Sequence, residues 1–311
     1  MQLESDINHI LSLAITEDLG EKGDITTNTC VPADLMIQGT FLIKQKGLIA
    51  GLALLEPLFQ KIDPQITVKL LVKEGSFQLA GASVAEVSGP ARGIMTGERC
   101  ALNLLQHLSG IASTTAEYVK KVAGHPCAIL DTRKTLPGLR ALEKYAVRMG
   151  GGHNHRFTLD DRFIIKGNHL ACMGLPISKA IPAAVEMAKK AYPNSVIEIE
   201  VSREELFDVA LNTAVDAIVL LGMSPDDVTE FAQKGHGAGK KIYVESSVPM
   251  TPDTALAYAE AGVDGIAIGA ITSSIQALDI GFRLSMQKLD SNEGQVKAKK
   301  GLLSRFFSKR H

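Results

Sequence analysis

From residue 127 onward, short apolar runs alternate with stretches of helical periodicity, and this rhythm restricts the possible folds more than any other feature of the sequence. Helical patterns separate six apolar runs, at residues 127–131, 162–166, 196–201, 216–221, 241–246 and 265–270. Short buried strands that are joined by helical crossovers build a parallel sheet covered by helices. The pattern therefore predicts either an α/β barrel or a doubly wound α/β fold.

The residues at the ends of these runs distinguish between the two folds. These residues are Arg133, Lys134, Lys166, Glu200, Leu221, Ser247 and Gly269. All of them except Leu221 are polar, charged or small. Barrel enzymes assemble their active sites from the C-terminal ends of several strands, whereas a doubly wound sheet concentrates function at one switch point. The spread favours a barrel. The sequence also lacks a G-x-G-x-x-G motif after a strand and the P-loop pattern, which argues against those nucleotide sites.

The first third of the chain is organised differently. Residues 6–19 predict an amphipathic helix that ends near Gly20, and residues 92–122 predict a long helix that carries Arg99. Between them lie β-type runs broken by glycine and proline, at residues 36–43, 66–72 and 83–88. This organisation predicts a mixed α+β segment rather than further βα repeats. A chain of 311 residues has room for a barrel and a smaller domain.

Charge and composition limit the partners and the compartment. The net charge of -1 gives no global attraction to nucleic acid or to membranes. The N-terminus lacks the pattern of a signal peptide, and the most apolar stretch, residues 47–55, is shorter than the roughly 20 residues that cross a bilayer. Four cysteines without a C-x-x-C pair favour free thiols in a reducing compartment. We therefore expect a cytoplasmic protein without nucleic-acid or membrane partners.

The basic tail, residues 291–311, leaves one alternative open. Its lysine and arginine side chains alternate with leucine and phenylalanine, a pattern that could contact anionic lipid or nucleic acid. A solvated chain end is the simpler interpretation, and we favour it.

Cations gather in the segments that follow the first two apolar runs. Successive loops of one expected barrel face carry five of them: Arg133, Lys134, His155, Arg156 and Lys166. An arginine fork binds a carboxylate or phosphate through two bonds, and several cations that converge on one pocket need an anionic ligand. His153 and His155 form an H-x-H pair without a third ligand at metal-site spacing, so we expect no metal held by the protein.

Glu198 and Glu200 lie two residues apart in one apolar run, so they share a face of the expected strand. In a barrel this face is the interior. A buried glutamate requires a partner such as a cation or a positively charged reaction centre. A structural ion pair between Glu200 and a lysine is the alternative.

Six longer segments resemble a known family: EDLGEKGDITT (17–27), GERCALNLLQHLSGIASTT (97–115), LDTRKTLPGLRALEKYAVRMGGGHNHR (130–156), FIIKGNH (163–169), IEIEV (197–201) and IGAITSSIQALDI (268–280). In these segments the chain resembles quinolinate phosphoribosyltransferase, the carboxylating nicotinate-nucleotide pyrophosphorylase of NAD biosynthesis. The resemblance runs from about residue 18 to residue 283, nearly the whole chain.

The resemblance implies an incomplete, open α/β barrel with an N-terminal α/β sandwich domain, as in type II phosphoribosyltransferases. It places the sandwich domain at residues 1–112, completed by about residues 275–290, and the barrel with the active site at residues 113–274. It also implies a homodimer in which Arg99 of one subunit reaches the active site of the other. A higher oligomer stays open.

The activity that the resemblance implies is phosphoribosyl transfer from phosphoribosyl pyrophosphate to quinolinate, with Mg²⁺. Loss of carbon dioxide then gives nicotinate mononucleotide. Lys134 and Glu200 would be catalytic, the first on the pyrophosphate side and the second near the ribose, where a carboxylate stabilises developing positive charge. The implied substrate-binding residues are Arg99, Thr132, Arg133, Lys134, His155, Arg156, Lys166, Glu200, Leu221, Ser247, Val248, Pro249, Ile268, Gly269 and Ala270.

The chain departs from the family's pattern in the phosphoribosyl half. Leu221 stands where the family usually has an aspartate, and a leucine cannot hold ribose or metal. The family's E-x-S-G-G or E-x-S-G-N becomes E-S-S-V-P at residues 245–249, and Pro249 has no N–H to donate. Gly167 and Ser273 replace an acidic residue and a basic residue or histidine. Three hypotheses stay open: a working enzyme with an altered phosphate site, a relative that acts on another aromatic acid, and a non-catalytic dicarboxylate-binding dimer.

Overall fold

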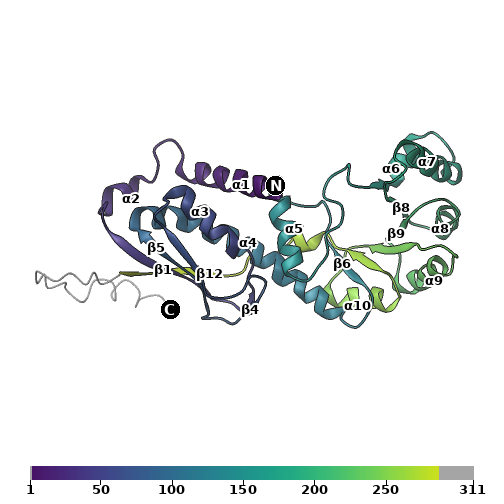
Figure 1. Cartoon of the computed structure of the whole chain (residues 1–311). Coiled ribbons are helices and arrows are strands. Elements are labelled where there is room, and N and C mark those ends of the chain that lie inside the picture. The colour runs from purple at the N-terminus through teal and green to yellow at the C-terminus, as the bar shows by residue number, and fades with distance from the viewer. Residues whose placement is uncertain (1, 287–311) are drawn as a thin grey trace, which may run out of the picture.

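One long helix joins the two main β-sheets of the protein, a four-stranded and a six-stranded sheet. The computed structural model describes residues 2–286, so the basic tail lies outside the described residues. Helix α4 (Ala91–Lys121) runs from the N-terminal sheet to the C-terminal sheet (Figure 1). It confirms the predicted long helix, and the expected domain boundary at residues 112/113 falls inside it. Within residues 2–286, no helix has the length and hydropathy to cross a membrane.

The C-terminal sheet has six parallel strands in the order β6-β11-β10-β9-β8-β7. All six predicted apolar runs form these strands: β6 (Ala128–Leu130), β7 (Phe163–Ile165), β8 (Ile197–Val201), β9 (Ala217–Leu221), β10 (Tyr243–Ser247) and β11 (Gly265–Ala267). The first two strands, β6 and β7, stand at opposite ends of the order. The sheet therefore stays open, which confirms the prediction of an incomplete barrel.

Helices cross between these strands as the periodicity predicts: α5 (Arg140–Met149), α7 (Ile177–Ala191), α8 (Glu204–Leu211), α9 (Pro225–His236) and α10 (Pro252–Glu260). Helices α9 and α10 are capped by the preceding residues Ser224 and Thr251, whose side chains accept backbone N–H groups of the first turn. Two short helices, α6 (Gly167–Cys172) and α11 (Ala270–Ser273), follow strand ends where the sequence predicted only loops.

The N-terminal sheet is antiparallel, with the order β12-β1-β5-β3. Its strands are β1 (Met36–Ile43), β3 (Thr67–Leu70), β5 (Ser83–Pro90) and β12 (Ile280–Met286), with a separate β2–β4 pair (Gly47–Leu48 and Phe77–Gln78). The accompanying helices are α1 (Gln2–Leu19), α2 (Ile25–Cys30), η1 (Leu52–Leu54) and α3 (Leu55–Ile62). Strand β12 returns from the far end of the chain and pairs with β1. Gly39 of β1 lies under the ring of Phe282, where a Cβ atom would come within 2.0 Å of the ring.

Burial along β8 shows how the parallel sheet positions a site. Ile197, Ile199 and Val201 are buried and alternate with Glu198 and Glu200. Since side chains alternate across a strand, the apolar set packs on one face while both glutamates point to the other.

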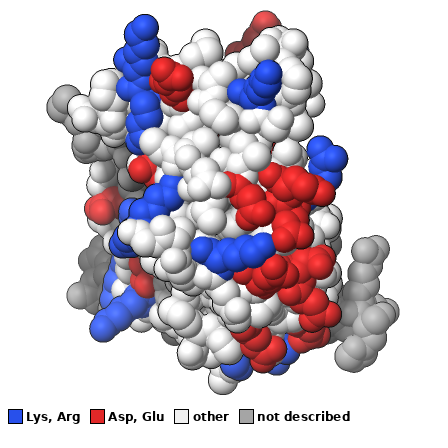
Figure 2. Space-filling model, turned by 90° about the vertical axis from the view of Figure 1, so that its right-hand side faces the viewer, with Lys and Arg blue, Asp and Glu red and all other residues white. Residues whose placement is uncertain are grey.

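The outer face of the barrel region carries mixed charge. In Figure 2, acidic side chains gather on one side of this face and basic side chains are scattered singly.

Candidate active site

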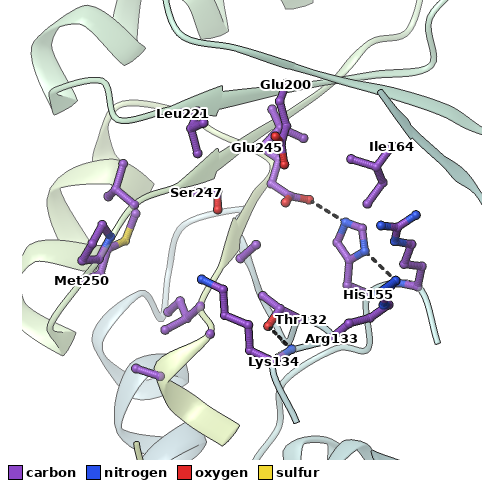
Figure 3. Close-up of a pocket in the computed structure, with 18 of the residues that line it drawn as sticks. Thr132, Arg133, Lys134, His155, Ile164, Glu200, Leu221, Glu245, Ser247 and Met250 are labelled. Carbon is purple, nitrogen blue, oxygen red and sulfur yellow. Dashed lines mark hydrogen bonds and ion pairs between the residues drawn. The ribbon is translucent and has the colours of Figure 1, made fainter. Parts of the chain in front are cut away.

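A cavity of about 610 Å³ lies at the C-terminal ends of the parallel strands (Figure 3). Side chains from the ends of all six strands line it, as expected for a barrel active site. The cavity brings together every expected substrate-binding residue except Arg99: Thr132, Arg133, Lys134, His155, Arg156, Lys166, Glu200, Leu221, Ser247, Val248, Pro249, Ile268, Gly269 and Ala270.

Arg99 lies elsewhere. It is an exposed residue in the N-terminal half of α4 and does not line the cavity of its own chain. Its predicted contact with the acid therefore requires a second copy of the protein.

Arg133 presents the clearest unsatisfied group of the cavity. Its Nε and Nη1 atoms are buried, and neither has a hydrogen-bond partner among the described residues. Arg156 lines the same cavity, and burial followed by the charge of Arg133 lowers its pKa. Two guanidinium groups held this close, one of them unpaired, require an anion to balance them.

His155 is surrounded by carboxylates. Its Nε2 atom lies 3.2 Å from Glu198 and 3.4 Å from Glu245, and all three side chains are buried. Burial lowers the pKa of His155, but the two carboxylates outweigh burial and raise this pKa to about 9. The backbone N–H of Arg156 donates to Nδ1 at 2.7 Å, so a second ring proton would displace this bond. Both ring nitrogens thus contact protein atoms in this conformation.

The two glutamates beside His155 differ in environment. Burial raises the pKa of both, but the charge contact with His155 and the hydrogen bond from Arg162 outweigh burial for Glu198, whose pKa is lowered. Arg162 donates to Glu198 at 2.6 Å, whereas burial prevails at Glu245 and leaves its pKa raised. The anionic form is therefore better stabilised at Glu198 than at Glu245.

Glu200 forms an ion pair with Lys166 across the ends of β8 and β7, at 2.5 Å. Lys166 is 46% exposed and Glu200 is 16% exposed, so the pair faces the open part of the cavity. This is the ion pair that the sequence left open as an alternative for Glu200. A pair this exposed separates readily when a charged ligand offers better partners.

Lys134 reaches into the cavity from the loop after β6. Its backbone oxygen accepts a bond from Thr272 at 2.8 Å, and its side chain crosses Gly269 so closely that a Cβ atom there would lie 2.6 Å from Cδ. In Figure 3 the ammonium group extends toward the side of Ser247. A side chain at position 269 would therefore have to displace this lysine from its present path.

The opposite side of the cavity is apolar. Leu221 is 42% exposed at the end of β9, and Val248, Pro249 and Met250 follow the end of β10. Tyr118 of α4 donates to the backbone oxygen of Met250 at 2.7 Å and fixes this segment. The cavity thus has one cationic side and one apolar side.

The donor set of the cavity does not fit a magnesium ion held by the protein. His155, Glu198 and Glu245 place ligand atoms within 4.8 Å of one another, a possible three-ligand set. Mg²⁺ prefers oxygen ligands, usually one or two carboxylates together with substrate phosphates. Both of these glutamates face the imidazole. Toward the open part of the cavity, Glu200 is paired with Lys166 and the next strand end offers only Leu221.

Comparison with known proteins identifies the family. Residues 24–109 match the quinolinate phosphoribosyl transferase N-terminal domain, and residues 111–283 match the C-terminal domain. The chain belongs to the quinolinate phosphoribosyltransferase family. Its 37% identity with the probable carboxylating nicotinate-nucleotide pyrophosphorylase of Bacillus subtilis extends over 92% of this chain and 94% of the relative. The Mycobacterium leprae enzyme of that name is 39% identical over 87% of this chain and 94% of its own.

Solved structures agree with the fold of this quinolinate phosphoribosyltransferase relative. The nicotinate-nucleotide pyrophosphorylase from Ehrlichia chaffeensis superposes with a TM-score of 0.83 at 33% identity, over 89% of this chain and 98% of that one. The protein from Francisella tularensis gives 0.82 at 32% identity, over 90% and 96%. The predicted family and the predicted combination of an N-terminal domain with an open barrel are confirmed.

Sequence reasoning missed five residues that line the cavity of this family member: Ile164, Val219, Glu245, Met250 and Ala267. It had singled out Glu198 and Ser273, which also line the cavity, but had not counted them as substrate-binding residues. Strand alternation could have found three of them. Ile164, Val219 and Glu245 lie two residues before Lys166, Leu221 and Ser247, so each shares a strand face with an expected residue.

Proposed function

We propose that this protein transfers the phosphoribosyl group of phosphoribosyl pyrophosphate to the ring nitrogen of quinolinate and releases carbon dioxide, forming nicotinate mononucleotide and pyrophosphate. Family membership supports this type of chemistry. The observation that carries the proposal is Arg133, whose buried Nε and Nη1 atoms lack partners beside Arg156. A planar dicarboxylate supplies the acceptors that these two groups need.

The acid would bind on the cationic side of the cavity. Arg133 and Arg156 hold its carboxylates, and Lys166 joins them by leaving Glu200. This exchange frees the carboxylate of Glu200 as the acid arrives. Glu200 is then available for the positive charge that develops on the ribose.

The reaction exchanges one bond at the ribose and one at the ring. The ring nitrogen attacks the anomeric carbon as its bond to pyrophosphate breaks, and Lys134 stabilises the departing charge. The positively charged ring then accepts the electron pair of the bond to the adjacent carboxylate. Carbon dioxide leaves, and a proton takes its place on that ring carbon.

Magnesium enters this scheme as part of the substrate. We propose that Mg²⁺ arrives bound to the pyrophosphate oxygens of the donor, because Glu200 is the one carboxylate that the described residues 2–286 offer toward the open part of the cavity. Mg²⁺ commonly keeps waters and phosphate ligands of this kind. No step of the scheme requires a second protein carboxylate.

We further propose a homodimer, in which Arg99 of one subunit completes the acid site of the other. The exposed position of Arg99 on α4 supports this arrangement. We also propose a cytoplasmic location, because cysteines stay free in a reducing compartment. Cys30, Cys100, Cys127 and Cys172 are all free.

The test is direct. The protein is incubated with quinolinate, phosphoribosyl pyrophosphate and Mg²⁺, and nicotinate mononucleotide is followed by chromatography together with carbon dioxide from a labelled 2-carboxylate. We expect the two products in equal amounts. Product at the level of a protein-free control would reject the proposal.

Leu221 favours a second candidate: a protein that binds an aromatic dicarboxylate without phosphoribosyl transfer. An exposed leucine beside Val248 and Pro249 offers apolar surface where a charged donor would lie. Calorimetry with quinolinate alone separates the candidates. Binding without turnover selects the second, and the absence of binding rejects both.

A further inference from the structure

The N-terminal turn of α5 lies behind the cavity, between the two loops that carry its arginines. The first loop, residues 132–139, follows β6 and carries Arg133. The second loop, residues 150–157, follows α5 and carries Arg156. Neither loop belongs to a helix or named strand. Backbone bonds of His153 with Ile129 and Asp131 tie the start of the second loop to the end of β6, and side-chain bonds hold the parts of both loops that lie nearer the arginines.

Arg140, at the start of α5, bonds to both loops. Its Nε atom donates to the hydroxyl of Thr135 in the first loop at 3.1 Å. Its Nη1 atom donates to the backbone oxygen of Phe157 in the second loop at 3.1 Å. One guanidinium group therefore spans the two segments.

Glu143 holds the first loop from within the core. Its side chain is completely buried. One carboxylate oxygen accepts the backbone N–H of Leu136 at 3.2 Å, and the other faces Nε2 of His107 on α4 at 2.9 Å. This carboxylate links the first loop to the long helix.

Lys144 holds the second loop. Its completely buried ammonium group pairs with the equally buried Asp131 and donates to the backbone oxygen of His155 at 3.1 Å. The N–H of His155 donates to Asp131 at 2.9 Å. In the amide orientation that satisfies both of its ends, Asn154 donates to the other Asp131 oxygen at 2.8 Å. Apart from the bond to each other, Lys144 and Asp131 thus make their hydrogen bonds to the segment that precedes Arg156.

A buried ion pair is poor evidence of added stability, because apolar residues of the same volume often serve a core as well. Burial lowers the pKa of Lys144 and raises that of Asp131, while each partner opposes the effect on the other. Apolar substitutes would leave the N–H of His155 and the amide of Asn154 without acceptors. Apolar core residues could therefore replace the volume of Lys144 and Asp131 but not their hydrogen bonds to the loop.

We propose that Arg140, Glu143 and Lys144, which we call the α5 brace, are positioning residues that fix the spacing between Arg133 and Arg156 for the acid. Without a ligand, two guanidinium groups on separate loops repel each other, and the brace keeps them in place. The inference rests on the proposed function, because it takes the acid as their shared ligand. A dicarboxylate that is gripped by two forks tolerates little change in their separation.

The test uses the full chain with two variants that avoid an isolated buried charge. Arg140→Met removes the bridge from a half-buried residue, and Asp131→Asn combined with Lys144→Met neutralises the buried pair. Arg148→Met is the matched control, since Arg148 is exposed on the same helix. The measurements are the thermal midpoint, calorimetric binding of quinolinate, and hydrogen–deuterium exchange of residues 132–139 and 150–157.

We expect Arg140→Met and the neutral pair to fold, to lose affinity for quinolinate by about 10- to 100-fold, and to exchange faster in both loops, as misplacement of binding groups produces. In turnover, KM for the acid should rise far more than kcat falls. Arg148→Met should behave as the wild type. Unchanged affinity in either folded brace variant overturns the inference. If the wild type binds no quinolinate, the proposed function fails and exchange alone decides: unchanged exchange in Arg140→Met overturns the brace.

Discussion

Removal of the Arg133 guanidinium gives the sharpest test of the acid site. Arg133→Ala deletes the two buried N–H groups that lack partners in the free protein. These groups make no hydrogen bonds in the free protein, so they cannot stabilise its fold in that way. Their contribution should instead be to the affinity for a ligand. The variant should therefore separate stability from affinity.

The magnitude follows from the two bonds that the fork can make. A hydrogen bond to a charged group contributes about 1.5–3 kcal/mol, so loss of the pair costs at least about 3 kcal/mol. Since about 1.4 kcal/mol corresponds to a tenfold change, quinolinate affinity should fall by at least about 100-fold. Removal of a buried unpaired group relieves its desolvation, so the thermal midpoint of the free protein should stay level or rise.

Calorimetry without phosphoribosyl pyrophosphate measures this affinity, and a thermal melt of the free protein measures the midpoint. Arg133→Lys serves as an intermediate variant, because it keeps the charge and loses the fork. Arg148→Ala controls for the loss of an exposed arginine. An Arg133→Ala protein that binds quinolinate as the wild type does would show that the guanidinium does not hold the acid. A midpoint that falls by several degrees would show that the guanidinium has a structural partner in the free protein.

Three further predictions address the remaining parts of the site. Glu200→Gln should reduce kcat by about 100-fold and leave acid affinity nearly unchanged, because it removes one electrostatic group at the ribose; an unaltered kcat in steady-state assays would exclude that role. Leu221→Asp should lower the Mg²⁺ concentration needed for half-maximal rate, and the uncharged control Leu221→Asn should not; equal behaviour would contradict our view of this strand end. Arg99→Ala should inactivate the protein alone but regain measurable activity when its subunits are exchanged with Arg133→Ala subunits, since mixed dimers contain one intact site; no recovery would argue against sharing of Arg99.

Much of the fold could be predicted from periodicity alone. The six apolar runs became β6–β11, and their spacing fixed the crossover helices, because both signals are local to the sequence. Strand order is not local. Whether the last strand lies beside the first is a tertiary matter, and only the chemistry of the strand ends favoured the barrel, in which β11 pairs with β6. The short helices α6 and α11 escaped prediction because such lengths carry little periodicity.

The sequence could indicate which residues line the cavity, but it could not show which of their charged side chains form ion pairs with one another. Alternation placed Glu198 and Glu200 on one face, and both line the cavity. It could not show that Arg162 would pair with Glu198 while Arg133 stayed unpaired. Pairing depends on side-chain reach across different loops, which spacing along the chain does not record.

The charged side chains of the cavity fall into two groups, those that form ion pairs in the free protein and those that do not. Arg162 balances Glu198, and Lys166 balances Glu200 in the free protein. This leaves three cations of the cavity without a carboxylate partner within residues 2–286: Arg133, Lys134 and Arg156.

Two of these remaining cations are the arginines of the acid side, which matches the charge of a dicarboxylate. Lys134 alone remains for the pyrophosphate, beside apolar strand ends at Leu221 and Val248. One lysine cannot neutralise a diphosphate that enters an apolar surrounding, where unbalanced charge is costly. If the transfer occurs as proposed, the balance must come from Mg²⁺ carried in by the donor, so the rate should depend more steeply on free Mg²⁺ in this protein than in the Leu221→Asp variant.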